Sequence, residues 1–191
     1  TVSELRPNAT DNADFYHDEQ FYDEVLVDNL ASSIANTHGD QMRILHQMGS
    51  HGPAYYKRIP QAFIKHNPAC LTEDFSQCTQ DEIKNTYTDT VRYTEYVISK
   101  AIEELEKLKA THDTALIYVS DHGESTGEMG LYLHGIPWML APDEQTHVPA
   151  LMWFSDSYIQ SRHLDMNCMT ASKHELYSHD NISHTVLSLL D

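Results

Sequence analysis

The 191-residue sequence has no long hydrophobic run and few basic residues. Its longest apolar runs are ALIYV at 115–119 and VPALMWF at 148–154, far short of the roughly 18 residues that a transmembrane helix needs. Lysine and arginine total 12 against 29 acidic residues, which gives a formal net charge of -17. Because nucleic-acid binding depends on neutralising phosphates, this charge argues against a nucleic-acid partner.

Cysteine is also scarce, with three residues in the sequence. Cys70 and Cys78 lie in PACLTEDFSQCTQ, too far apart for the usual zinc-binding cysteine pair and suited to a loop disulfide. Such a disulfide would indicate an oxidising compartment. Cys168 is left over, and it is either free or paired with a cysteine outside this chain.

An initial methionine and a signal peptide are both missing, so we interpret the sequence as a piece of a longer polypeptide. Its length suits one domain or most of one, and the mean hydropathy of -0.50 suits a globular protein. The acidic excess fits either a solvated acidic surface or a protein that binds cations.

Apolar periodicity predicts alternating helices and strands. Thr79 or Asp81 can cap the longest helix, and Gly39 ends an earlier one. This alternation favours an α/β layer architecture with a largely parallel sheet. The predicted elements in chain order are a loop to about residue 20, a helix over 22–38, a strand-length segment over 42–48, a helix over 80–109, strands over 114–120 and 148–154, and a helix from about 180 to the end.

Two of the predicted strand ends carry histidine among glycines. His51 follows the first strand-length segment in GSHGP, and Asp121 and His122 follow the second in YVSDHGE. Ligands of α/β sheets gather at the carboxyl ends of strands, and Asp with His suits zinc or a similar divalent ion. The long loop that follows carries His134. The alternative is that Asp121 caps a turn and His122 packs nearby.

GESTG at 123–127 matches the G-x-S-x-G nucleophile elbow of serine hydrolases. That motif needs a helix immediately after the turn. Glycines and a proline follow here instead, so we do not favour a serine nucleophile.

Three segments together resemble a known family: LHQMGSHGPAYYKR, YVSDHGESTGEMGLYLHGIP and APDEQTHVPAL. They are similar to lipid A phosphoethanolamine transferases, including the mobile colistin-resistance enzymes that confer polymyxin resistance. The resemblance covers roughly residues 40–190. It implies an alkaline phosphatase/sulfatase-like α/β sandwich with a largely parallel sheet flanked by helices. Residues 1–191 would then be the C-terminal part of a periplasmic catalytic domain, anchored in the bacterial inner membrane by an N-terminal segment.

The resemblance also implies a mechanism and roles for five residues. Zinc activates a threonine, which takes phosphoethanolamine from phosphatidylethanolamine and passes it to a lipid A phosphate. Asp121 and His122 match two ligands of the tightly bound zinc. His51 and His134 match histidines that hold the phosphate or a second metal, and Glu124 is a weaker candidate for that second metal.

The family pattern is incomplete in this sequence. No segment matches the nucleophilic threonine or the further acidic zinc ligand, both of which lie upstream in the family. We therefore expect the chain alone to be inactive. The alternatives are a sulfatase or phosphodiesterase of the same superfamily, which would use water as acceptor, and a non-catalytic metal-binding domain.

Overall fold

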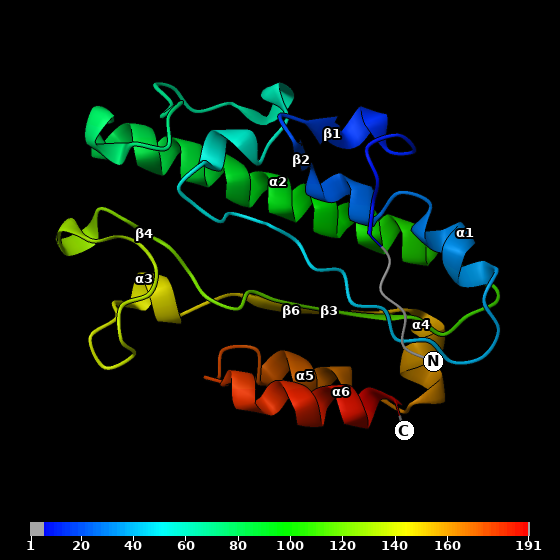
Figure 1. Ribbon diagram of the computed structural model, residues 1–191. Coiled ribbons are helices and arrows are strands. Elements are labelled where there is room, and N and C mark those ends of the chain that lie inside the picture. The colour runs from blue at the N-terminus through cyan, green and yellow to red at the C-terminus, as the bar shows by residue number, and fades with distance from the viewer. Residues whose placement is uncertain (1–5, 191) are drawn as a thin grey trace.

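The computed structural model describes residues 6–190, in which helices cover both faces of a central strand pair (Figure 1). The pair consists of β3 (Ala115–Val119) and β6 (Ala150–Phe154). The long α2 (Gln80–Glu106) lies on one side, and α5 (Met166–Ala171) and α6 (Ile182–Leu190) lie on the other. The expected α/β sandwich is therefore confirmed.

The strand direction differs from the prediction. β3 and β6 run antiparallel, with Ala115 opposite Phe154, and every strand pair within residues 6–190 is antiparallel. The expectation of a largely parallel sheet was wrong for this part of the chain. A parallel pair needs a long crossover, usually a helix, whereas the connection from β3 to β6 contains only the four-residue α3 (Asp143–Thr146).

The predicted long helix is confirmed, and its first turn is closed by a capping box. The Thr79 hydroxyl accepts a hydrogen bond from the Glu82 amide at 3.3 Å, and the Glu82 carboxylate accepts from the Thr79 amide at 2.6 Å. One face of α2 packs into the main core, which contains Val27, Leu30, Ile59, Tyr93, Val97 and Ala101.

The helix predicted over 22–38 is broken in two. The 3₁₀ helix η2 (Asp23–Leu26) and α1 (Leu30–Ala35) are separated by Asn29, which has a left-handed φ of 57°. A side-chain acceptor on α2 explains why a new helix begins here. The Glu104 carboxylate accepts a hydrogen bond from the Ala31 amide at 3.0 Å and so holds the start of α1 against α2. Helical spacing alone did not reveal the break.

The strand-length segment 42–48 has no regular secondary structure and pairs with no strand of the described chain. Its end is held by a side chain instead: the buried Asp23 carboxylate accepts from the amides of Met48 at 2.9 Å and Gly49 at 2.7 Å. Leu45 packs against the main core. This anchor fixes the backbone directly before His51.

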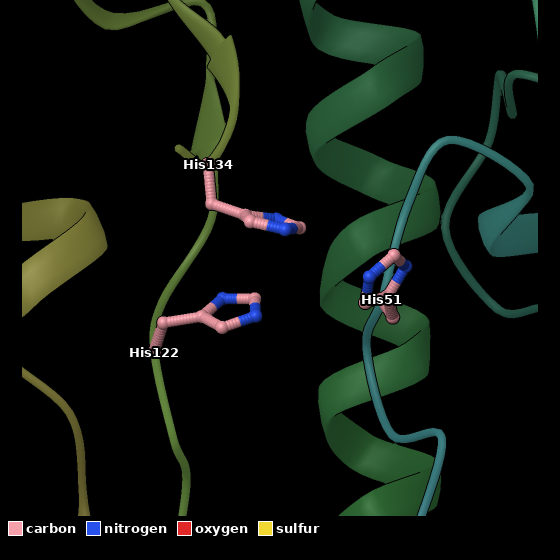
Figure 2. A group of neighbouring side chains, drawn as sticks. All are labelled: His51, His122 and His134. Atoms are coloured by element: carbon pink, nitrogen blue, oxygen red, sulfur yellow. The ribbon is translucent and has the colours of Figure 1, made fainter. Parts of the chain in front are cut away.

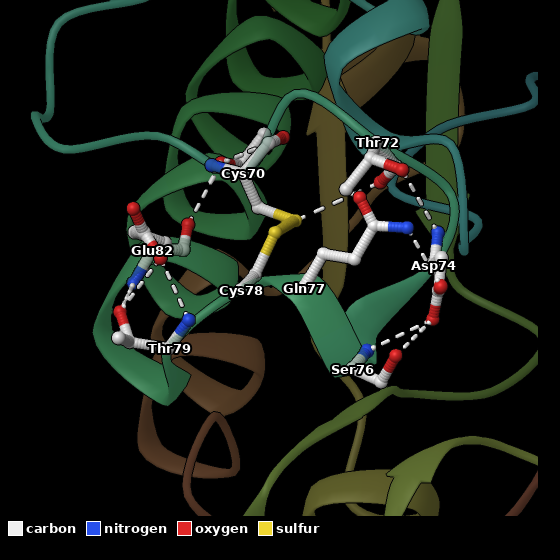
Figure 3. Close-up of a disulfide and its surroundings, with 9 residues drawn as sticks. Cys70, Thr72, Asp74, Ser76, Gln77, Cys78, Thr79 and Glu82 are labelled. Carbon is white, nitrogen blue, oxygen red and sulfur yellow. Dashed lines mark hydrogen bonds between the residues drawn. A yellow bond between two sulfur atoms is a disulfide. The ribbon is translucent and has the colours of Figure 1, made fainter.

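The disulfide between Cys70 and Cys78 is present, as predicted (Figure 3). Cys70 is buried with Tyr55 and Ile83 in a second core cluster, so the disulfide fixes its loop against the start of α2. Cys168 is a free, exposed cysteine. Within residues 6–190, no helix has both the length and the apolar character that crossing a bilayer requires.

The remaining elements are short. The N-terminal segment to about residue 20, predicted as loop, contains some of them, and residues 1–5 and 191 lie outside the described part. The others lie between the longer helices and strands. The short elements are η1 (Ala13–Phe15), β1 (Tyr16–His17), β2 (Gln20–Phe21), η3 (Tyr55–Lys57), η4 (Gln61–Phe63), η5 (Phe75–Gln77), β4 (Ser125–Thr126), η6 (Glu128–Gly130), β5 (Tyr132–Leu133), α4 (Asp156–Ser161) and η7 (His179–Asn181).

Candidate metal centre

Three histidines from separate segments converge at one end of the strand pair (Figure 2). One ring nitrogen from each of His51, His122 and His134 lies within 4.8 Å of the others. His51 follows the segment anchored by Asp23, His122 follows β3, and His134 follows β5. The structure thus brings together the two predicted strand ends and adds the histidine of the long loop.

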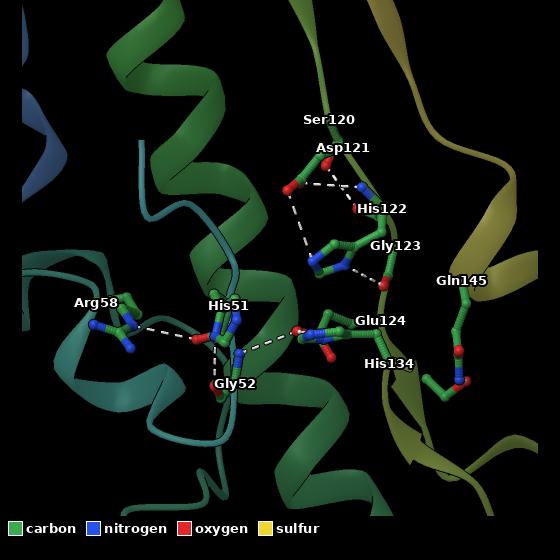
Figure 4. A network of polar contacts seen from close by, with 11 residues as sticks. His51, Gly52, Arg58, Ser120, Asp121, His122, Gly123, Glu124, His134 and Gln145 are labelled. Atoms are coloured by element: carbon green, nitrogen blue, oxygen red, sulfur yellow. Dashed lines mark hydrogen bonds and ion pairs between the residues drawn. The ribbon is translucent and has the colours of Figure 1, made fainter. Parts of the chain in front are cut away.

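Each of these rings has its Nδ1 atom beside an oxygen acceptor (Figure 4). For His51 the acceptor is the Gly52 carbonyl at 2.6 Å, and for His122 it is the Gly123 carbonyl at 3.0 Å. A neutral imidazole that donates from Nδ1 keeps its lone pair on Nε2. The local backbone therefore favours the tautomer in which Nε2 can bind a cation.

The third ring is held by a carboxylate. His134 Nδ1 lies 3.1 Å from Glu124 Oε1, which also accepts a hydrogen bond from the Gly52 amide at 3.2 Å. Glu124 is 6% exposed and lies outside the group of three converging histidines. A carboxylate behind a histidine is a common support for metal-binding imidazoles.

Asp121 lies at the edge of the cluster. Its side chain is 84% exposed; Oδ1 accepts from the His122 amide at 3.1 Å, and Oδ2 is 3.9 Å from His122 Nε2. The structure therefore places His122 with His51 and His134, and places Asp121 beside this group. Assignment of Asp121 and His122 to a separate tight zinc site stays a prediction.

Two glycines allow the segments of the cluster to approach one another. A Cβ at Gly123 would overlap the Glu144 carbonyl oxygen and come within 3.0 Å of its carbon. A Cβ at Gly52 would overlap the Leu133 side chain and lie 3.0 Å from the Tyr55 hydroxyl. Glycine is needed at both positions because its missing side chain leaves room for close packing.

The serine of GESTG is not a nucleophile in this structure. Ser125 has 0% exposure and accepts a hydrogen bond from Gln145 Nε2 at 2.8 Å. The Gln145 carbonyl also accepts from the Gly123 amide at 3.0 Å. This packing fixes the loop, and the nucleophile-elbow alternative is contradicted.

Sequence reasoning did not find two supporting side chains. Arg58 Nε donates to the His51 carbonyl at 3.2 Å, while burial lowers the pKa of Arg58 and the Asp23 carboxylate opposes that shift. His179 Nε2 lies 2.8 Å from the Ser120 carbonyl, where the chain leaves β3. Neither residue lies in a distinctive sequence pattern.

Comparisons with known proteins agree with this geometry. A family model described as Sulfatase matches residues 1–191. "Phosphoethanolamine transferase EptA" from Escherichia coli K12 is 44% identical over 88% of this chain and 31% of its own length. "Phosphatidylethanolamine transferase Mcr-2" from Escherichia coli is 41% identical over 82% of this chain and 28% of its own length. The chain thus spans about a third of the length of these relatives.

Solved structures show the same fold. The soluble domain of lipooligosaccharide phosphoethanolamine transferase A from Neisseria meningitidis matches 96% of this chain and 55% of its own, with 38% identity and a TM-score of 0.89. The integral membrane form of that protein matches with the same TM-score of 0.89 over 34% of its length.

Proposed function

We propose a function for this chain from the premise that it belongs to the sulfatase family, whose model covers residues 1–191. The function is transfer of phosphoethanolamine from phosphatidylethanolamine to lipid A, with zinc as the metal. The names of the similar proteins support the transferred group. The observation that carries the proposal is the convergence of His51, His122 and His134.

The donor set fits zinc. Imidazole and carboxylate are both common zinc ligands, and catalytic zinc sites commonly have three protein ligands and one open position. The oxygen acceptors on the Nδ1 atoms resemble the supporting contacts that orient metal-binding histidines. A bound zinc ion would supply Lewis-acid chemistry and lower the pKa of a hydroxyl nucleophile.

We assign different roles to the residues of the centre. Asp121 and His122 hold the tightly bound zinc, and the carboxylate balances part of the ion's charge. His51 and His134 hold the phosphoryl group or a second metal, and thereby stabilise the charge that develops on the phosphoryl oxygens. Glu124 keeps His134 in place for this task, and it is also the weaker candidate for a second metal together with His51 and His134.

We further propose that the nucleophilic threonine, another acidic zinc ligand and an N-terminal membrane anchor lie outside residues 1–191. The integral membrane relative supports a membrane anchor, which we assign to the bacterial inner membrane. The disulfide supports a periplasmic catalytic domain, since disulfides persist in oxidising compartments.

A variant series tests the roles. In the complete polypeptide, Asp121→Ala should lose zinc and transfer together, whereas His51→Ala and His134→Ala should keep tight zinc but lose about 10²–10³ in transfer rate. His147→Ala, an exposed histidine of the same loop, is the matched control. Zinc content, melting temperature and mass-detected transfer to lipid A are measured on each purified protein.

The outcomes separate the alternatives. If the His51 and His134 variants unfold early yet retain near-normal turnover when folded, these residues are structural. Sulfate or phosphodiester hydrolysis without transfer to lipid A would favour a hydrolase that uses water as acceptor. Robust transfer by residues 1–191 alone would refute the placement of the nucleophile outside this chain. Zinc binding by the complete polypeptide without any turnover would indicate a non-catalytic metal-binding domain.

A further inference from the structure

Two buried polar atoms behind the histidine cluster have no hydrogen-bond partner in standard geometry: Tyr55 Oη and Glu124 Oε2. Tyr55 is 1% exposed and Glu124 is 6% exposed, so bulk water does not solvate either group. A buried polar group left unpaired costs about 1–3 kcal/mol. A phenol is a hydrogen-bond donor and a carboxylate oxygen an acceptor, so the two groups are complementary.

Gly52 places the two groups next to each other. Its amide donates to Glu124 Oε1 at 3.2 Å, and a Cβ built on the same residue would lie 3.0 Å from Tyr55 Oη. Burial raises the pKa of Tyr55, and the negative charge of the Glu124 carboxylate raises it further. The phenol therefore stays protonated and available as a donor.

The Tyr55 ring is itself fixed. It stacks on Phe75 with ring centroids 5.7 Å apart and meets the Tyr87 ring edge-on at 5.4 Å. It also belongs to the core cluster that contains the disulfide-bonded Cys70. A hydroxyl on so constrained a ring can act as a rigid support.

We propose that Tyr55 is a positioning residue: its hydroxyl donates to Glu124 Oε2, and Glu124 through Oε1 holds Nδ1 of His134. Glu124 thereby connects the core to the histidine cluster, because its Oε1 atom lies 3.1 Å from His134 Nδ1. It keeps the lone pair of His134 on Nε2. This inference adds a supporting residue to the proposed centre, and its importance for catalysis rests on the proposed function.

Glu124 has two possible roles, support of His134 and direct binding to a second metal, and the proposal selects the first and excludes the second. A ligating Glu124 would present an oxygen to the ion, whereas Glu124 lies outside the group of converging ring nitrogens. Both of its oxygens are used for support in our assignment. The two roles predict different effects of removing the Tyr55 hydroxyl.

The first test uses the metal-free protein, so that it does not depend on the proposed function. Long-range ¹H–¹⁵N spectra of the histidine rings report which ring nitrogen carries the proton. His134 should be the Nδ1–H tautomer in the wild type, and Tyr55→Phe and Glu124→Gln should each shift it toward a mixture. A mixed tautomer in the wild type, or an unchanged His134 in Tyr55→Phe, would overturn the proposal.

The second test measures the affinity of the zinc-loaded complete polypeptide for a second zinc ion, held by His51 and His134, by competition with a chromophoric chelator. Loss of supporting contacts typically weakens metal binding about 10- to 100-fold, and we expect Glu124→Gln in this range and Tyr55→Phe near its lower end. Tyr93→Phe is the matched control, since Tyr93 is also buried with an unpaired hydroxyl but lies in the other core cluster. Its zinc affinity should be unchanged.

The remaining outcomes are also decisive. A large loss in Glu124→Gln with no loss in Tyr55→Phe would identify Glu124 as a ligand and refute our assignment. Equal losses in Tyr55→Phe and Tyr93→Phe would show a general effect of core hydroxyls and refute it too. Failure of the wild type to bind zinc would refute the proposed function, while the tautomer spectra would still decide the role of Tyr55.

Discussion

The contact between Gly123 and α3 offers a sharp test of how the centre is built. In Gly123→Ala the new methyl group would overlap the Glu144 carbonyl oxygen, which belongs to the backbone and cannot swing aside. Gly123 does not have a positive φ, so the steric contact alone sets the cost. The chain can respond to the new methyl group in two ways, and the cost in free energy of unfolding can be estimated for each.

If α3 moves away, two hydrogen bonds break: the Gly123 backbone amide donates to the Gln145 carbonyl at 3.0 Å, and the Gln145 side-chain Nε2 donates to the Ser125 hydroxyl at 2.8 Å. At about 0.5–1.5 kcal/mol each, this response costs about 1–3 kcal/mol. If α3 stays, overpacking costs about 1–3 kcal/mol. We therefore expect the free energy of unfolding to fall by about 1–3 kcal/mol by either route.

Urea unfolding measures this loss, and amide hydrogen exchange at residue 123 identifies the route. Exchange should become faster if α3 moves away and stay slow if the loop is merely compressed. Gly39→Ala is the control, because Gly39 has a φ of +82° and no atom within 4 Å of the new methyl group. Its cost should come from backbone strain, without any change in exchange at Gly123. An unfolding free energy of Gly123→Ala within about 0.5 kcal/mol of the wild type would refute this packing.

Three further predictions concern the scaffold. Non-reducing peptide mapping should recover Cys70 and Cys78 as one linked pair, and replacing both with serine should lower the unfolding free energy by about 2–3 kcal/mol; free thiols in periplasmic material would contradict this. Thr79→Ala should cost about 1 kcal/mol in urea unfolding by opening the capping box, whereas Thr79→Ser should restore most of it. Burial opposes ionisation of Asp89, but hydrogen bonds from His66 and Lys65 outweigh it and lower the Asp89 pKa. Because the folded pKa lies below the unfolded value, this stabilisation is present above about pH 4 and is lost as the pH falls through the folded pKa; a melting temperature whose acid dependence is unchanged in Asp89→Asn would contradict it.

Local patterns in the sequence predicted the elements whose causes are local. The apolar stripe of α2 and its capping residue lie within one segment, so the sequence predicted the helix and gave Thr79 as one of two capping candidates. The direction of β6 relative to β3 depends on a connection of about 30 residues, which periodicity does not describe. The break at Asn29 likewise depends on contacts with α2, which are distant in the sequence.

In the candidate site, too, the sequence predicted the residues that carry a local pattern and missed one that depends on distant packing. Histidine after a predicted strand end placed His51 and His122 near each other, and the structure brings them together with His134. The supporting role of Tyr55 could not be predicted, because a tyrosine between alanine and another tyrosine gives the pattern of an ordinary core residue. Only the packing around Gly52 reveals what its hydroxyl can contact.

The position of the histidine cluster makes it a cross-link between distant parts of the chain. His51 belongs to the segment that packs with α2, whereas His122 and His134 belong to the segments that follow β3 and β5 (Figures 1 and 2). An ion held by His51 together with His134 would bind only the folded arrangement and would add RT ln(1 + [ion]/Kd) to its stability, about 2.7 kcal/mol at an ion concentration of 100 Kd. Depletion of such an ion would therefore raise the unfolded fraction and expose the chain to proteolysis.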